Sequence, residues 1–272
     1  MDIFQAIILG AVQGLTEFLP ISSSAHLVLV PWALGWPAHG LAFDAALHLG
    51  TLSALLLYFW RDWLAVGRAF VLGLTISRER QTFEYALAWM LILGSVPAAV
   101  VGFVAQDFIE STVRQPQTIA GVMVLFAIVL LIAERLGVRR RAMERLTMID
   151  ALMIGMAQAL ALVPGVSRSG ITITAGLLLG FTRPAAARFS FLLSTPIALA
   201  AGSLQLVQLL RTGPDGEALT VLGVGVLTAA VTGLAAITVL LRFLQHNSTD
   251  VFVWYRVAAG LCIFLITLVH PG

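Results

Sequence analysis

Long apolar segments separated by short polar ones make up most of this chain. A helix needs roughly 20 residues to cross a bilayer, and six continuous segments reach that length, at about 41–60, 85–106, 117–136, 186–210, 218–242 and 251–270. The ten-residue alternation typical of a membrane β-barrel is not seen in the sequence. The pattern predicts an all-α polytopic membrane protein, with residues 1–272 forming a single integral membrane domain.

Two further apolar regions, at about 3–35 and 148–181, are interrupted by clusters of Pro, Ser and Gly. The first cluster covers residues 20–24 and the second covers residues 164–170. Irregular backbone at membrane depth is tolerated only where protein buries it or where it lines a wet cavity. We therefore expect both regions to be re-entrant, each a broken pair of helices that does not span the membrane.

The two interrupted regions resemble each other in sequence. Residues 6–15 align without gaps with residues 151–160, and the same register pairs Ser22 with Ser167 and Ser24 with Ser169. Fainter matches follow in the same order: 43–47 with 189–193, 98–102 with 229–233, and 120–121 with 259–260. Chance similarity between apolar helices is the alternative. We interpret the chain as two repeats, about 1–140 and 148–272, each a broken element followed by three spans.

The arginines predict the orientation. One predicted loop contains Arg61, Arg68, Arg78 and Arg80, another contains Arg135, Arg139, Arg140, Arg141 and Arg145, and the loop between them, at about 107–116, has only Arg114. Cytoplasmic loops are enriched in basic residues, so both Arg-rich loops are expected inside the cell. Both termini are then periplasmic. Three spans per repeat turn the second repeat upside down, which is the inverted topology of many membrane proteins with a site at the midplane.

Composition narrows the function. The chain is 59% hydrophobic and 11% charged, against about 25% charged in soluble domains. All 16 basic residues are Arg, which excludes any mechanism that needs a lysine. The arginines lie beside apolar spans, so the basic pI does not indicate nucleic-acid binding. The one cysteine, Cys262, excludes a disulfide, and the N-terminus has no features of a cleaved signal peptide.

The second cluster carries a cation in an apolar setting. Arg168 costs about 2.5–3.5 kcal/mol at membrane depth. The surrounding Gly and Ser residues, among them Gly165, Ser167 and Ser169, interrupt the helix and release backbone N–H groups. A cation, hydroxyls and free N–H donors together make a site for an anion, and phosphate is the anion we expect.

The first cluster carries a carboxylate. Gln13 and Glu17 lie four residues apart and share one face of a helix. An ionisable residue in an apolar helix is functional by default, although a structural ion pair with a buried arginine is the alternative. Pro20 predicts that this helix ends near Leu19.

The next helix is expected to start with serines. Ser22, Ser23 and Ser24 can cap it or meet a ligand, and His26 follows one turn later. The histidine is either a packing residue or an acid/base group. Farther along, Asp44 and His48, and likewise Arg183 and Arg188, lie at the ends of spans. We interpret these four as interface residues, with tuning of the site as the alternative.

These residues together suit phosphoryl transfer. Arg168 and N–H groups would bind the phosphoryl oxygens and the developing charge. Glu17, with Gln13, could hold a divalent cation through oxygen. The nucleophile would be a serine or a water, and His26 would take its proton or protonate the leaving group.

These motifs resemble those of the undecaprenyl-diphosphate phosphatase family of the bacitracin-resistance type. Its (E/Q)-x-x-x-E motif is Gln13 to Glu17 here, followed by Ser22, Ser23 and His26. Its P-G-x-S-R-S-x-x-T motif is complete at residues 164–172, ending at Thr172. The resemblance covers essentially the whole chain. The leading Gln is neutral, so only one of the two motif side chains is an anionic metal ligand.

The resemblance implies a bacterial inner-membrane enzyme that removes the terminal phosphate of undecaprenyl diphosphate, a polyprenyl diphosphate lipid. The product is the lipid carrier for peptidoglycan precursors. It also implies Mg²⁺ or Ca²⁺ dependence, with Gln13 and Glu17 as metal ligands. The implied catalytic residues are Glu17, Ser23, His26 and Arg168, and the implied phosphate-binding residues are Ser22, Gly165, Ser167, Ser169 and Thr172. Ser23 is favoured as nucleophile with His26 as its partner, and a water activated by the metal or by Glu17 is the rival.

A transporter or flippase for a lipid phosphate or a small anion is the alternative function. Inverted repeats with broken helices also build transporters, which need binding but no nucleophile. The expected partners are the lipid substrate and the bilayer, and no nucleic acid. A homodimer is left open, because the small residues Gly223, Gly225 and Gly233 can pack helices within one chain or between two.

Overall fold

The computed structural model describes residues 1–37, 40–112, 115–212 and 216–269, and their regular structure is helical. Five helices are long and apolar enough to cross a membrane: α5 (Phe83–Thr112), α6 (Pro116–Leu136), α9 (Arg183–Thr212), α10 (Gly216–His246) and α11 (Asp250–Val269). The prediction of an all-α polytopic membrane protein is thereby confirmed. Because α5 continues to Thr112, the predicted loop at 107–116 is shorter than expected, and Arg114 lies outside the described residues.

A bent pair of helices provides the sixth apolar segment. α3 (Leu41–Tyr58) and α4 (Trp60–Thr75) meet at an angle of 75° and together have the length and composition of a span. The prediction that Arg61 and Arg68 lie in a loop is wrong, because both are on α4.

Aromatic packing explains why α4 is helical. The Phe70 ring contacts Tyr85 and Trp89 of α5 at centroid distances of 6.5 and 5.5 Å. A Cβ at Gly73 would lie 2.4 Å from the Tyr85 ring, so the two helices pack closely at that point. The arginines occupy the opposite, exposed side of α4. These arginines made the segment look like a polar loop in the sequence, although its apolar residues have helical spacing.

Four short helices form the two interrupted regions: α1 (Ile3–Phe18), α2 (Ser23–Leu34), α7 (Met148–Ala159) and α8 (Arg168–Leu178). Residues 19–22 connect the first pair, and α1 ends beside Leu19 as Pro20 predicts. Residues 160–167, which include the 3₁₀ turn η3 (Leu160–Leu162), connect the second pair. Both predicted breaks are therefore present in the structure.

The first helices of the two pairs start in the same way. The Asp2 carboxylate accepts the Gln5 N–H at 2.8 Å, and the Thr147 hydroxyl accepts the Asp150 N–H at 3.2 Å. Each N-cap N–H in turn donates to the side chain three residues later. Such a capping box satisfies two N–H groups that the helix leaves unpaired. These caps fix where α1 and α7 begin.

Glycines bring the first helix of each short pair, α1 and α7, against a long helix of the other half of the chain. A Cβ at Gly10 of α1 would lie 2.6 Å from the Gly225 carbonyl oxygen of α10. A Cβ at Gly155 of α7 would lie 2.1 Å from the Gly94 carbonyl oxygen of α5. Both distances exclude any larger residue without a shift of backbone. The two halves are interlocked through equivalent pairs of glycines.

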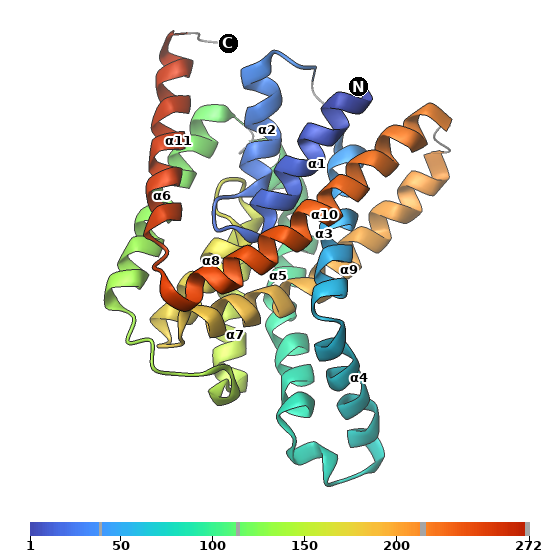
Figure 1. Ribbon diagram of the computed structural model, residues 1–272, viewed down its shortest axis with the longest axis vertical. Helices are drawn as coiled ribbons and strands as arrows, with labels where there is room; N and C mark the ends of the chain where they lie inside the picture. Colours follow the sequence, from blue (N-terminus) through green and yellow to red (C-terminus); the bar gives the residue numbers. More distant parts are fainter. Residues whose placement is uncertain (38–39, 113–114, 213–215, 270–272) are drawn as a thin grey trace.

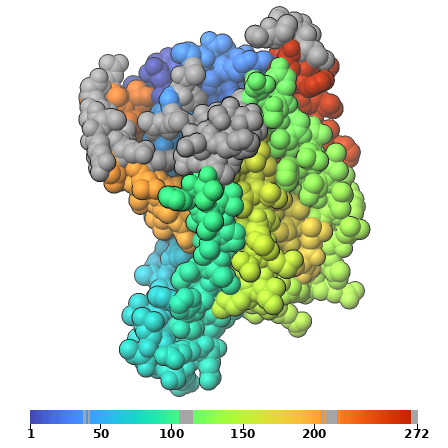
Figure 2. Space-filling model, turned by 180° about the vertical axis from the view of Figure 1, so that it is seen from behind, coloured from blue at the N-terminus to red at the C-terminus, as the bar shows by residue number. Residues whose placement is uncertain are grey.

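The arrangement has two distinct ends (Figure 1). α1 begins and α11 ends at one end, and the connection between α4 and α5 forms the other. The α6–α7 connection also lies toward that second end. Figure 2 shows the lower part of α4 and α5 projecting beyond the rest of the molecule. The Arg-rich segments are therefore on the side opposite to the start of α1.

The largest apolar core lies next to the breaks. The Phe191 ring of α9 contacts Phe18 of α1 at 5.5 Å and Phe59, between α3 and α4, at 6.4 Å. All three side chains are at least 98% buried. The Phe18–Phe191 pair is edge-to-face, a geometry that adds about 0.5–1.5 kcal/mol beyond burial. It fixes the end of α1 against α9.

The span-end arginines are ion-paired across helices. Glu134 of α6 is 1% exposed and accepts from Arg183 Nε at 3.0 Å and from the Thr249 hydroxyl at 2.8 Å. Arg188 pairs with Asp62 of α4. These contacts hold α9 to α6 and to α4. Arg183 and Arg188 thus have ion-pair partners on other helices, and their position at the membrane interface stays a prediction.

Candidate active site where the two broken regions meet

The two breaks have the same unusual backbone. Ser22 and Ser167, which the sequence repeat pairs, precede α2 and α8 with φ angles of 76° and 72°. Positive φ is uncommon for residues other than Gly and costs of order 1–3 kcal/mol. Gly165 has φ 98°. Strain at matched positions indicates that both helix starts are held in place by their surroundings.

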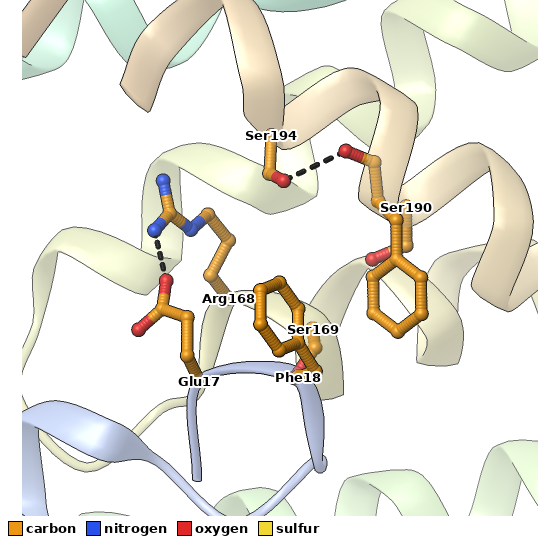
Figure 3. Close-up of a pocket in the computed structure, with 7 residues that line it drawn as sticks. Glu17, Phe18, Arg168, Ser169, Ser190 and Ser194 are labelled. Atoms are coloured by element: carbon orange, nitrogen blue, oxygen red, sulfur yellow. Dashed lines mark hydrogen bonds and ion pairs between the residues drawn. The ribbon is translucent and has the colours of Figure 1, made fainter. Parts of the chain in front are cut away.

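Glu17 lies at the centre of the site. Its carboxylate accepts from Gln13 Nε2 at 3.1 Å, from the Ser23 hydroxyl and from the Arg168 guanidinium. The Glu17 side chain is 7% exposed and Arg168 is 23% exposed. Figure 3 shows the Glu17–Arg168 pair reaching across from α1 to α8. The structure thus brings a buried carboxylate and a partly exposed cation together from residues 151 positions apart.

The serines and threonine of the second motif surround the start of α8. The Ser169 hydroxyl donates to the Leu19 carbonyl at 3.1 Å, and Thr172 lies 2.5 Å from the Ser190 hydroxyl. Ser167 caps the helix by accepting the Gly170 N–H at 3.1 Å. These contacts connect α8 to the first break and to α9.

A small pocket opens at the ion pair. It is lined by Glu17, Phe18, Arg168, Ser169, Ser190, Phe191 and Ser194 (Figure 3). Ser190 and Ser194 come from α9 and were not predicted as site residues. They are four residues apart in a segment that reads as a membrane span. The sequence signal that could have identified them was therefore two hydroxyls on one face of that predicted helix. Phosphate oxygens entering the pocket would meet hydroxyls, a cation and the start of α8.

His26 has partners other than Ser23. Its Nδ1 lies 2.7 Å from the Ser22 carbonyl oxygen, which can only accept, so Nδ1 carries a proton. Its Nε2 lies 2.7 Å from the Tyr255 hydroxyl, and the two rings stack at 5.7 Å. Both ring nitrogens are therefore engaged, whereas the Ser23 hydroxyl donates to Glu17. In this arrangement His26 is not hydrogen-bonded to Ser23, the nucleophile that it was expected to assist.

His48 of α3 reaches the site. Its Nε2 lies 3.7 Å from a Glu17 carboxylate oxygen, and its Nδ1 donates to the Asp44 carbonyl at 2.8 Å. Of the two interpretations of His48, this contact favours tuning of the site over a simple interface residue. The argument that singled out Glu17, a costly polar group within an apolar span, applies equally to His48.

The oxygen atoms available for a metal are few. In the part of the chain that the structure describes, no three His, Cys, Asp or Glu side chains lie together in a way that could hold an ion. The Gln13 Oε1 atom is buried and has no hydrogen-bond partner, and Glu17 is beside it. Mg²⁺ is commonly held by one or two protein oxygens together with substrate phosphates. Gln13 and Glu17 fit a cation that arrives with a phosphorylated substrate.

Comparison with known proteins gives a consistent result. The family model described as "Bacitracin resistance protein BacA" matches residues 6–262. The undecaprenyl-diphosphatase of Thermomicrobium roseum is 49% identical over 98% of each chain. That of Geotalea daltonii is also 49% identical over 98% of each chain, and that of Geobacter sulfurreducens is 51% identical over 96% of each.

Proposed function

Because the chain belongs to the BacA family of bacitracin resistance proteins, we propose that it hydrolyses undecaprenyl diphosphate to undecaprenyl phosphate and inorganic phosphate. Relatives of nearly equal length are named undecaprenyl-diphosphatase. The observation that carries the proposal is the Glu17–Arg168 ion pair, which joins the last turn of α1 to the start of α8. The activity recycles the lipid carrier for peptidoglycan synthesis.

The site residues divide the reaction between the two halves. Arg168 and the N–H groups at the starts of α2 and α8 bind the terminal phosphate, where helix termini favour anions. In the pair with Glu17, Arg168 is already oriented toward that space. When the diphosphate enters, its charge replaces the carboxylate as the partner of the guanidinium. Arginine geometry matches phosphate oxygens in a bidentate contact.

Ser23 is the proposed nucleophile, and Glu17 is its base. The Ser23 oxygen forms a bond to the terminal phosphorus while the bond from that phosphorus to the bridging oxygen breaks. The Ser23 proton passes to the Glu17 carboxylate, and undecaprenyl phosphate leaves. Water then attacks the phosphorus of the phosphoserine, and the bond from phosphorus to the Ser23 oxygen breaks. Glu17 returns its proton to that oxygen, and phosphate leaves with the proton of the water. His26 acts by holding the Ser22 carbonyl, which orients the start of α2.

A divalent cation, Mg²⁺ or Ca²⁺, is part of the proposal. Gln13 and Glu17 would hold it, together with oxygens of the substrate. It would neutralise charge on the diphosphate. The buried, unpaired Gln13 Oε1 supports this assignment.

The fold proposed for this site is a pair of inverted repeats, each with a re-entrant element. The interlocked glycines support it, because Gly10 meets Gly225 as Gly155 meets Gly94, and the sequence register pairs these positions. α1 and α7 also enter the molecule from opposite ends (Figure 1). We place the Arg-rich connections in the bacterial cytoplasm and both termini in the periplasm. A homodimer in the membrane stays a prediction, for which the mass of the detergent-solubilised protein is the test.

The decisive experiment measures phosphate release from a polyprenyl diphosphate by the purified protein in detergent. Hydrolysis requires Ser23 and Arg168, whereas transport requires only binding and access from both sides. We expect Ser23→Ala to lower kcat by about 1,000-fold and the neighbouring Ser24→Ala to lower it much less. Full activity of Ser23→Ala would assign the nucleophile to water. Lack of phosphate release by the unmodified protein would leave the transporter alternative.

A further inference from the structure

Arg256 of α11 is a fully buried cation behind the site. Its side chain is 0% exposed and its guanidinium donates only to backbone carbonyl groups. These are Met123 at 3.2 Å, Pro20 at 3.3 Å, Gly165 at 2.8 Å and Val166 at 3.1 Å. Within the described residues no carboxylate is paired with Arg256. A buried guanidinium without a counter-charge is costly, so its position calls for a reason.

Three of the four carbonyl groups belong to the breaks that carry the site. Pro20 lies in the connection between α1 and α2, and Gly165 and Val166 lie in the connection between α7 and α8. One planar side chain therefore bridges two loops from opposite halves of the chain. A residue that merely attached α11 to α6 would need only the Met123 contact.

Arg256 also determines which way the peptide before α8 faces. The C=O and N–H of a peptide unit point in opposite directions. Because the Val166 carbonyl is held by Arg256, the Ser167 N–H points away from α11. The guanidinium rests against the first turn of α8, where a Cβ at Gly170 would lie 3.1 Å from it. The next residue after Ser167 is Arg168, which meets Glu17.

We propose that Arg256 is a positioning residue for phosphoryl transfer. It holds the two breaks at one separation, which keeps Arg168 and the N–H groups at the start of α8 in line with Ser23 and Glu17. This inference rests on the proposed function. Arginine is required because its five donors lie in a rigid fork that can span several carbonyls, whereas the three donors of lysine share one nitrogen.

The first test compares Arg256→Lys and Arg256→Gln with Arg183→Gln in the phosphate-release assay. Arg183 is a partly buried arginine that also makes several hydrogen bonds, but it contacts Glu134 and neither break. We expect both Arg256 variants to lose about 100-fold in kcat with a much smaller change in KM, while Arg183→Gln keeps its kcat. Full activity in Arg256→Lys or Arg256→Gln, or an equal loss in Arg183→Gln, would overturn the proposal.

The second test needs no catalysis. Spin labels at Leu34 and Leu178, the exposed last residues of α2 and α8, report the separation of the two elements in a Cys262→Ser background. We expect Arg256→Gln to broaden or shift the distance distribution and Arg183→Gln to leave it unchanged. If the parent protein releases no phosphate, the proposed function fails while this distance still decides the positioning role. An unchanged distribution in Arg256→Gln contradicts that role.

Discussion

The two broken regions have similar backbone conformations but different functional side chains. Both have a capping box, a close glycine contact and a serine with positive φ before the second helix. In the first region Gln13 donates to Glu17. In the second, the register places Gln158 and Leu162 at those positions, and the Gln158 amide is buried with both polar atoms unpaired. The similar backbone of the two regions supplies the frame, and the sequence differences between them divide the charges between the two halves of the chain.

The largest expected effect follows from removing the cation of the second half. Arg168→Ala leaves Glu17 buried without its ion-pair partner and removes the charge that faces the phosphate. We expect kcat to fall about 10³-fold or more, as for other phosphoryl-transfer arginines, in an assay of released phosphate. Arg168→Lys serves as the control for charge alone, since lysine lacks the bidentate fork. A wild-type kcat in Arg168→Ala would show that the second half of the chain does not contribute to the site.

Enlarging the matched glycines tests the shared frame. Gly10→Ala and Gly155→Ala each force a Cβ against a backbone carbonyl of the facing helix. We expect each to destabilise the protein by about 1–3 kcal/mol, measured by thermal unfolding in detergent. Gly223→Ala is the control, because nothing lies within 4 Å of a Cβ there. Unequal behaviour of Gly10→Ala and Gly155→Ala would show that the two contacts are not equivalent.

A smaller effect is expected at His48, whose counterpart region in the second half has no histidine. Replacing His48 by Ala removes a polar group 3.7 Å from Glu17 but leaves Arg168 and Ser23 in place. We expect a loss of about tenfold in kcat/KM, the lower part of the range for a supporting polar group. His246→Ala is the control, since that residue lies at the exposed end of α10. If the two variants have the same kcat/KM, His48 takes no part in the reaction.

The smallest effect, and one of opposite sign, is expected at Gln158. Gln158→Leu replaces an amide without partners by an apolar side chain, and unpaired buried polar groups cost about 1–3 kcal/mol. We expect a rise of about 1 kcal/mol in stability with unchanged kcat. The matched Gln13→Leu should instead lower activity, because Gln13 contacts Glu17. A loss of phosphate release in Gln158→Leu would mean that the second half contributes more than a frame and a cation.

Much of the site could be predicted from short-range sequence logic. Pro20 places the end of α1, the serines mark the start of α2, and the cost of burying Glu17 and Arg168 singles out both residues. The contributions of Ser190, Tyr255 and Arg256 were not predicted, because each lies in a segment that reads as an ordinary span, and a role for His48 in the site was only the alternative interpretation. α4 was missed because its arginines suggested a loop, while its apolar face packs on α5.

The sequence by itself determined the class of protein, the positions of the breaks and the family. Hydropathy, helix-breaking residues and motif spacing are local properties, and they survive without knowledge of the packing. Only the tertiary structure decided which side chains are paired with one another. Glu17 pairs with Arg168, His26 with Tyr255, and Arg256 with both breaks, because helix packing brings together residues 90 or more positions apart. Such pairings depend on how the helices cross, which no local pattern encodes.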